Sequence, residues 1–259
     1  MIRNLLVITG VGGVIALAGI TGAFALAGND VSHNDWTWVV TDDEAGGNSH
    51  FRVERGPAAA DTVRTINWNG GDSLSVDVPG RVTYVQGSEA GIRITGPKSL
   101  VDRVRFEDGR LSVAYSDEPE RSYVRLNRNG VNVWSDTEAL RITVTAPAVK
   151  TFQMAEPGQL NIRDYDQPTL TVTANGSGKV VAEGRADRAD VTVNGSGRVD
   201  LDDLEVTDAT VDISGSGDVV VGPTGRADVQ ISGSGDAVLT RRPSRLQQTI
   251  DGSGEVEQF

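Results

Sequence analysis

The triplet Gly-Ser-Gly occurs five times in the last third of this 259-residue chain, and its steady spacing constrains the fold more than any other feature. The intervals between successive central serines are 19, 20, 18 and 19 residues, and those serines are Ser177, Ser196, Ser216, Ser234 and Ser253. A repeat of this kind is typical of a solenoid, in which each coil buries its apolar face only against the coils beside it. The spacing therefore predicts a stack of similar coils.

The residues on either side of each triplet predict that the coils are built from β-strand. In the second repeat Val191 and Val193 precede the triplet, Val199 and Leu201 follow it, and polar residues alternate with them. Alternation with a period of two is the pattern of a half-buried strand. The phase continues through the triplet, so both glycines should point inward, where the backbone turns tightly, while the serine points outward.

Two architectures fit this pattern. Asn-Gly is a strong signal for a tight antiparallel hairpin, so repeated hairpins would give a meander or sandwich. The strands of a meander have no reason to keep a spacing of about 19 residues, whereas the coils of a solenoid do. The sequence therefore favours an all-β fold, a parallel β-helix with coils of about 19 residues.

Stacked coils would align the outward side chains in columns, with about 4.8 Å between the strands of successive coils. We expect the short polar residues at and just before the corners to form the candidate interaction surface: Asn175, Ser177, Asn194, Ser196, Ser214, Ser216, Ser232, Ser234, Asp251 and Ser253. These side chains either hold a glycan or a peptide, or only bond one another to stabilise the corner. The column after them changes from positive to negative charge: Lys179, Arg198, Asp218, Asp236 and Glu255.

The N-terminus predicts export. Residues 5–27 are 23 uncharged residues, long enough for a hydrophobic helix to span a bilayer core of about 30 Å. Arg3 precedes this run and several acidic residues follow it, which places the N-terminus in the cytoplasm and the remainder outside. Because Ala25-Leu26-Ala27 also has the form of a signal-peptidase site, residues 1–27 are either a cleaved signal peptide or a single transmembrane anchor. We expect an exported cell-envelope protein on the periplasmic or extracellular side.

The next segment, residues 28–50, is polar and glycine-rich and reads as a linker. Within it Trp36 to Val40 either anchor at the membrane interface or form a first strand, and the pattern favours the strand. His33 and His50, the two histidines of the chain, are expected to be solvated and not metal ligands. A β-helix domain should then occupy residues 51–259.

Within that domain, further strands are expected from residue 51 onward, with rungs of the solenoid near Leu74, Ile92 and Leu111. Modest helical character is confined to residues 98–105. The stretch 117–138 interrupts the coil spacing and should form a hairpin on the side of the solenoid. The strands with the clearest signals are 63–68, 74–78, 82–85, 92–95, 101–106, 111–115, 123–126, 131–134, 140–145 and 151–154.

Composition excludes several functions. A net charge of -12 disfavours nucleic acid, which requires a basic footprint. The absence of cysteine excludes thiol catalysis and cysteine-based zinc sites, and no cofactor is expected. Acidic residues Asp200, Asp202, Asp203 and Asp208 are the densest carboxylate cluster, so the alternative function is a carbohydrate-active β-helix enzyme, a polysaccharide lyase or hydrolase. An acidic, solvated surface explains the cluster more simply.

Several segments, taken as a series, resemble a known family. They are Arg81 to Gly87, Gly91 to Pro97, Asp108 to Val113 and Leu140 to Pro147, followed by the Gly-Ser-Gly coils. The series is similar to the head GIN domain, labelled a putative auto-transporter adhesin, over about residues 70–259. The resemblance implies a right-handed β-helix in an exported or envelope-attached bacterial protein, and it brings no catalytic residues to carry over.

The sequence thus predicts a non-catalytic envelope domain that acts as an adhesin or as a surface-binding or structural protein. Its expected partners are the membrane, if residues 1–27 are retained, and an envelope glycan or protein. A β-helix with an open last coil also exposes strand edges, which predicts self-association through that end.

Overall fold

Strands make up most of the computed structural model, which describes residues 36–43, 50–55, 58, 60–116, 121–127, 130–155 and 157–259. The expected hydrophobic helix over residues 5–27 and the expected position of His33 lie outside these residues. Within the described part of the chain, no helix is long and apolar enough to cross a membrane. The chain divides into two compact units, which are described separately.

The first unit contains a four-stranded antiparallel sheet with the order β10-β9-β1-β2. The expected strand at Trp36 to Val40 is confirmed as part of β1, and stretch 117–138 does contain a hairpin, β9 and β10. That hairpin pairs with β1 through β9 and belongs to the first compact unit. The stretch expected to be a linker thus contributes a sheet strand. The bounds are β1 Trp36–Asp43, β2 His50–Arg55, β9 Arg121–Asn127 and β10 Gly130–Ser135.

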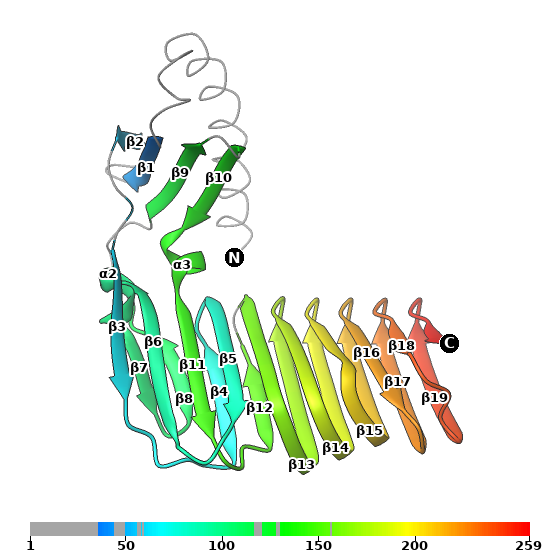
Figure 1. The fold of residues 1–259 in the computed structure, drawn as a ribbon. Helices are drawn as coiled ribbons and strands as arrows, with labels where there is room; N and C mark the ends of the chain where they lie inside the picture. The colour runs from blue at the N-terminus through cyan, green and yellow to red at the C-terminus, as the bar shows by residue number, and fades with distance from the viewer. Residues whose placement is uncertain are drawn as a thin grey trace. The chain divides into compact units, whose positions relative to one another are not determined.

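The second unit is a β-solenoid of about five turns (Figure 1). Three long strands, β13 (Gly158–Gly176), β14 (Lys179–Gly195) and β15 (Arg198–Gly215), each form a nearly complete coil and pair in parallel. Because successive coils pair in parallel through the Asn-Gly positions, the repeated-hairpin alternative is wrong. The later coils are divided into shorter strands: β16 Asp218–Pro223, β17 Arg226–Gly233, β18 Ala237–Leu239, β19 Arg245–Gly252 and β20 Val256–Gln258.

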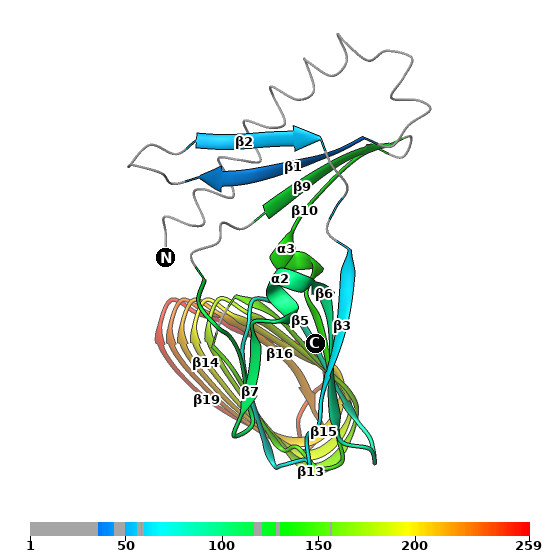
Figure 2. The same ribbon diagram turned by 90° about the vertical axis from the view of Figure 1, so that its left-hand side faces the viewer.

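Each coil has two walls, visible in the view along the stack (Figure 2). In β14 the short wall begins at Lys179, the chain bends near Gly184, and the long wall runs from Arg188 to Gly195. The Gly-Ser-Gly corner then leads to the short wall of the next coil. Stacking therefore places equivalent residues of successive coils side by side on both walls.

The core lies between the two walls. Val193 and Val199, on either side of a corner, are fully buried, Gly197 between them is buried, and Asn194, Ser196 and Arg198 are exposed. The predicted inward and outward phase is therefore confirmed at this corner. The interior of the solenoid is mainly Val, Ile, Leu and Ala, with larger rings only in its first coils, where Phe152 packs on Tyr84.

The N-terminal part of this unit extends both walls. Strands β12, β4 and β8 continue the long wall in parallel, and β5 and β11 continue the short wall. Strand β6 runs antiparallel to β11 and β3, so the expectation of a parallel coil at Ile92 is wrong, because the chain reverses between β5 and β6. The bounds are β3 Asp61–Ile66, β4 Ser73–Asp77, β5 Gly80–Gln86, β6 Gly91–Pro97, α2 Lys98–Val101, β7 Val104–Glu107, β8 Arg110–Val113, α3 Asp136–Ala139, β11 Arg141–Ala146 and β12 Thr151–Met154.

Candidate functional site

The ten residues predicted as the interaction surface lie in two adjacent columns, and all ten are exposed. The wall column runs along the end of the long wall, and strand pairing aligns its members Asn175, Asn194, Ser214, Ser232 and Asp251. The corner column consists of the central serines Ser177, Ser196, Ser216, Ser234 and Ser253. The structure thus brings together the residues that sequence reasoning selected.

Both glycines of the second triplet stack closely on the preceding coil, since a Cβ on Gly195 would lie 2.6 Å from the carbonyl oxygen of Gly176, but only the first glycine also has a positive φ. The first turns the corner with a positive φ, 124° at Gly195 and 124° at Gly215, a conformation that side chains disfavour. The second glycine has no such φ, and a Cβ on Gly197 would lie 2.9 Å from the carbonyl oxygen of Gly178. Sequence reasoning assigned both glycines to one tight corner and did not separate these two constraints.

A backbone ladder fixes the corner column in position. The amide of Ser196 donates to the carbonyl of Gly176 at 2.8 Å, and the amide of Ser216 donates to Gly195 at the same distance. Ser234 repeats the contact one coil further on. The backbone that carries the serine hydroxyls is therefore fixed by hydrogen bonds. A ligand that binds these hydroxyls costs the protein little further conformational entropy.

The wall column begins with a side-chain contact between coils. Asn194 Nδ2 donates to Asn175 Oδ1 at 2.9 Å. This bond is of the kind expected in the alternative in which members of the column bond one another to stabilise the corner. It occupies only one acceptor and one donor of two amides, so both side chains retain hydrogen-bonding capacity towards solvent.

The charged column follows the corner on the short wall. Arg198 Nη1 lies 3.3 Å from Asp218 Oδ2 in the next coil, and the amide of Glu255 donates to Asp236 Oδ1 at 2.9 Å. These contacts link neighbouring coils along the column. The column therefore gives one flank of the corner an acidic character towards the C-terminal coils.

Of the four aspartates considered for glycosidase chemistry, Asp200 and Asp208 contact different residues, and the backbone amide of Asp202 donates to Asp200 Oδ1 at 3.4 Å. Asp200, on the short wall, lies 4.0 Å from Lys179 Nζ, and Asp208, on the long wall, accepts the backbone amide of Arg226 at 2.7 Å. Asp202 and Asp203 are exposed between them. In the described residues no group of three or more acidic, His or Cys side chains could hold a metal ion.

A charged cluster at the start of the long wall also includes Asp208. Arg188 donates from Nε to both carboxylate oxygens of Asp190, at 2.8 and 3.0 Å, and from Nη2 to Thr210 Oγ1 at 3.0 Å. The hydrogen bond and charge of Asp190, followed by the charges of Asp208 and Asp228, raise the pKa of the Arg188 guanidinium. Of these contacts, the hydrogen bond between Arg188 and Thr210 links two successive coils.

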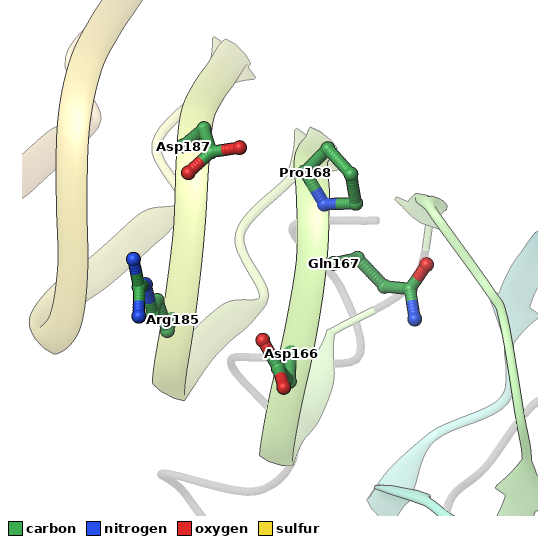
Figure 3. Close-up of a pocket in the computed structure, with 5 residues that line it drawn as sticks. All are labelled: Asp166, Gln167, Pro168, Arg185 and Asp187. Atoms are coloured by element: carbon green, nitrogen blue, oxygen red, sulfur yellow. The ribbon is translucent and has the colours of Figure 1, made fainter.

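A shallow hollow of about 240 Å³ lies at the opposite bend of the coils, lined by Asp166, Gln167, Pro168, Arg185 and Asp187 (Figure 3). The side chain of Gln86 fixes its edge through two hydrogen bonds to the backbone of Asp166, at 3.1 and 3.0 Å. Sequence reasoning missed this hollow because the bend carries no repeated motif comparable with the Gly-Ser-Gly corner.

Comparison with protein families gives a match over residues 72–243 to the family described as "Putative auto-transporter adhesin, head GIN domain". The chain belongs to the head GIN domain family. The match includes four of the five Gly-Ser-Gly corners, from Ser177 to Ser234, and the resemblance noted in the sequence is confirmed over this range. The coil that contains Ser253 lies beyond the matched residues.

One solved structure similar to this head GIN protein, a putative adhesin with a TM-score above 0.5, supports its fold. A putative adhesin from Bacteroides fragilis NCTC 9343 has a TM-score of 0.59 and 18% identity, with 78% of this chain and 99% of that chain covered. A putative adhesin from Parabacteroides merdae ATCC 43184 has a TM-score of 0.43 and 16% identity, with 77% and 96% covered. A putative lipid binding protein from Parabacteroides distasonis ATCC 8503 has 0.44 and 16%, also with 77% and 96% covered. No curated protein gives a significant match.

Proposed function

We propose that the solenoid is a non-catalytic, adhesin-like module of the bacterial cell envelope, and that it binds an uncharged glycan along the corner and wall columns. The observation that carries this proposal is the register: exposed hydroxyl and amide groups recur at each corner on a backbone fixed by hydrogen bonds between coils. A repeating polymer can meet the same group on successive coils, so weak single contacts add up.

The electrostatics narrow the ligand class. The chain carries a net charge of -12, and Asp218, Asp236 and Glu255 flank the serines on the short wall. Acidic polysaccharides would be repelled by this flank, whereas uncharged sugars would offer hydroxyls to Ser and Asn side chains, which both donate and accept. The other outcome of a binding experiment is that the ligand is a protein of the envelope.

The experiment is a glycan-array screen and an envelope pull-down with residues 36–259. A double variant, Ser196→Leu with Ser216→Leu, removes two adjacent hydroxyls of the corner column and adds apolar bulk there. Thr207→Leu is the matched control, because Thr207 is exposed on the same coil near the opposite bend. We expect the double variant to lose glycan binding while the control keeps it. If wild type captures no glycan, or if both variants behave alike, the proposal fails.

We also propose that the protein is exported, with residues 1–27 acting as a signal peptide or a membrane anchor. The charge asymmetry around residues 5–27 and the adhesin description of the family support this location. Fractionation of cells, with protease treatment of intact spheroplasts and sequencing of the mature N-terminus, tests it. A full-length product retained in the cytoplasm would contradict export.

Among the residues that the structure describes, no observation favours the carbohydrate-active enzyme. Asp200 and Asp208 lie on different walls of their coil, and each contacts a different neighbouring strand, β14 and β17. A glycosidase needs two carboxyl groups that converge on one bond from the two sides of the sugar. We therefore propose binding and not hydrolysis for this chain.

A further inference from the structure

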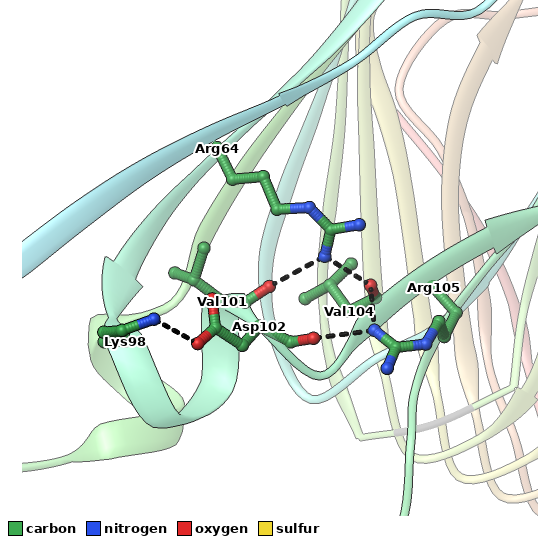
Figure 4. Close-up of polar contacts among 6 residues, drawn as sticks. All are labelled: Arg64, Lys98, Val101, Asp102, Val104 and Arg105. Carbon is green, nitrogen blue, oxygen red and sulfur yellow. Dashed lines mark hydrogen bonds and ion pairs between the residues drawn. The ribbon is translucent and has the colours of Figure 1, made fainter.

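The two ends of the solenoid differ in how their edges are covered. At the N-terminal end the guanidinium of Arg64, on β3, donates to the carbonyl of Val101 at 3.2 Å and to that of Val104 at 3.0 Å (Figure 4). This side chain joins β3 to the end of α2 and the start of β7. The apolar residues beneath it are closed from solvent, because Val101 and Val104 are fully buried.

At the C-terminal end, the edge of the long wall lacks such a cover among the described residues. Strand β19 pairs only with β17, and β20 only with β18. Ile250 of β19 occupies the position of Ile231 in the preceding coil, yet it is 39% exposed whereas Ile231 is fully buried. The free edge of β19 thus presents unpaired backbone groups beside a partly exposed apolar side chain, which is the arrangement that accepts another strand.

We propose that this edge binds the same edge of a second copy of the chain, so that two solenoids join through an antiparallel pair of β19 strands. Head-to-tail stacking would place β19 beside β7, the outer strand of the long wall at the N-terminal end, which runs antiparallel to β8 and is joined to β3 by Arg64. A twofold axis instead brings identical edges together, and two identical strands related by such an axis perpendicular to the sheet run antiparallel.

The alternation of inward and outward side chains along β19 determines the register of the antiparallel pair. Inward residues of one copy must face inward residues of the other. At the twofold axis a residue must therefore face its own counterpart in the second copy, and the axis cannot lie midway between two successive residues. Strand pairing with β17 makes Leu246, Gln248 and Ile250 the inward residues. An axis through Gln248 pairs Arg245 with Asp251 and Leu246 with Ile250, each pair twice.

Neighbouring registers lose this complementarity. An axis through Gln247 would pair Arg245 with Thr249 and Leu246 with Gln248, and an axis through Thr249 would pair Gln248 with Ile250. Only the axis through Gln248 matches charge with opposite charge and apolar with apolar side chains, the pairs that stabilise antiparallel strands.

The charge of the last coil supports association between two copies. Residues 241–259 contain three arginines and three acidic residues and are therefore neutral, although the whole chain carries -12. Repulsion between two copies is weakest where their local charge is balanced. The self-complementary end is thus also the end where two acidic molecules approach most easily.

Disulfide trapping tests the register directly, since the full chain contains no cysteine. In Gln248→Cys the two introduced thiols would face each other across the axis, with Cα atoms about 4.5 to 5.5 Å apart, within the range of a disulfide. We expect mild oxidation of the full chain, held at low concentration in a mild detergent, to give a covalent dimer. Ser196→Cys, exposed in the middle of the solenoid, is the control and should stay monomeric. Equal cross-linking of both variants would overturn the proposal.

Exchanging the charges of Arg245 and Asp251 tests the same interface by a second measurement, the strength of dimerisation. Arg245→Asp and Asp251→Arg should each weaken dimerisation at least tenfold in sedimentation equilibrium, because each places like charges opposite one another twice. The variant with both changes should recover the wild-type association, as the pairs are restored with reversed polarity. A monomeric wild type, or a double variant as weak as the single ones, would contradict this interface.

Discussion

Replacing Gly217 by alanine is the most informative perturbation of the corner. Gly217 is the second glycine of the third triplet and has a coil on each side. A Cβ at this position would lie 2.6 Å from Val193 Cγ1, and it would approach the carbonyl oxygen of Gly197 more closely than real Cβ atoms do. That carbonyl accepts the amide of Asp218 at 3.0 Å, so it cannot move without weakening the ladder between coils.

The magnitude follows from these contacts. Overpacking a well-ordered core costs about 1 to 3 kcal/mol, and a clash with backbone belongs at the upper limit, so we expect Gly217→Ala to lower the free energy of unfolding by about 3 kcal/mol. For a domain of this size, 1 kcal/mol shifts the melting temperature by about 2 to 4 °C, which gives a decrease of about 6 to 12 °C. Thermal unfolding followed by circular dichroism measures it.

Gly91→Ala is the matched control. A Cβ on Gly91, at the start of β6, would have no atom within 4 Å, and its φ lies outside the left-handed region. The same chemical change should therefore alter the free energy of unfolding by no more than about 0.5 kcal/mol. If Gly217→Ala unfolds at the same temperature as Gly91→Ala, the close stacking of the second glycines does not hold the coils together.

Three further changes test other parts of the structure. Burial raises the pKa of Tyr165, so the contribution of the neutral phenol to stability is complete below about pH 10 and is lost as the pH rises further. Tyr165→Phe should therefore make urea unfolding less sensitive to pH above 10. Arg64→Met removes charge-assisted hydrogen bonds to Val101 and Val104 and should cost about 2 kcal/mol, with faster amide exchange in α2. Asn194→Ala removes one exposed side-chain bond between coils and should cost about 0.5 kcal/mol in urea unfolding.

Each of these changes has a contrary outcome. If the stability of Tyr165→Phe in urea unfolding falls above pH 10 as steeply as that of wild type, burial does not protect the phenol of Tyr165 from ionisation. Exchange in α2 as slow as in wild type would show that Arg64 does not secure the N-terminal cap. A loss above about 2 kcal/mol in Asn194→Ala would assign the wall column mainly to stability, since an exposed neutral hydrogen bond contributes less than that.

Most of the solenoid could be predicted from the sequence because its determinants are local. The alternation around Val191 and Val193 fixes the inward face within a few residues, and the spacing of the triplets fixes the length of a coil. Parallel stacking then places Asn194 beside Asn175 with no further information. The two candidate columns follow from the same three facts.

The remainder depends on contacts between distant segments. The hairpin of β9 and β10 pairs with β1, some 80 residues earlier, and nothing in either segment specifies that partner. Likewise the reversal of β6 depends on β3 and β11, which lie on either side of it in the sheet. That Gly195 combines a positive φ with a close approach while Gly197 has the close approach alone could not be resolved either, because both constraints select glycine.

The central claim is that the Gly-Ser-Gly corners stack in register and form one continuous polar column. Spin labels at Ser177 and Ser253, on cysteines introduced at these exposed positions, test it by dipolar spectroscopy. Four coil spacings of about 4.8 Å predict a distance of about 19 Å, and labels at Ser196 and Ser253 should be closer by about 5 Å. Two distances that differ by one coil spacing would support the column. Equal distances, or a separation above about 30 Å for the first pair, would contradict it.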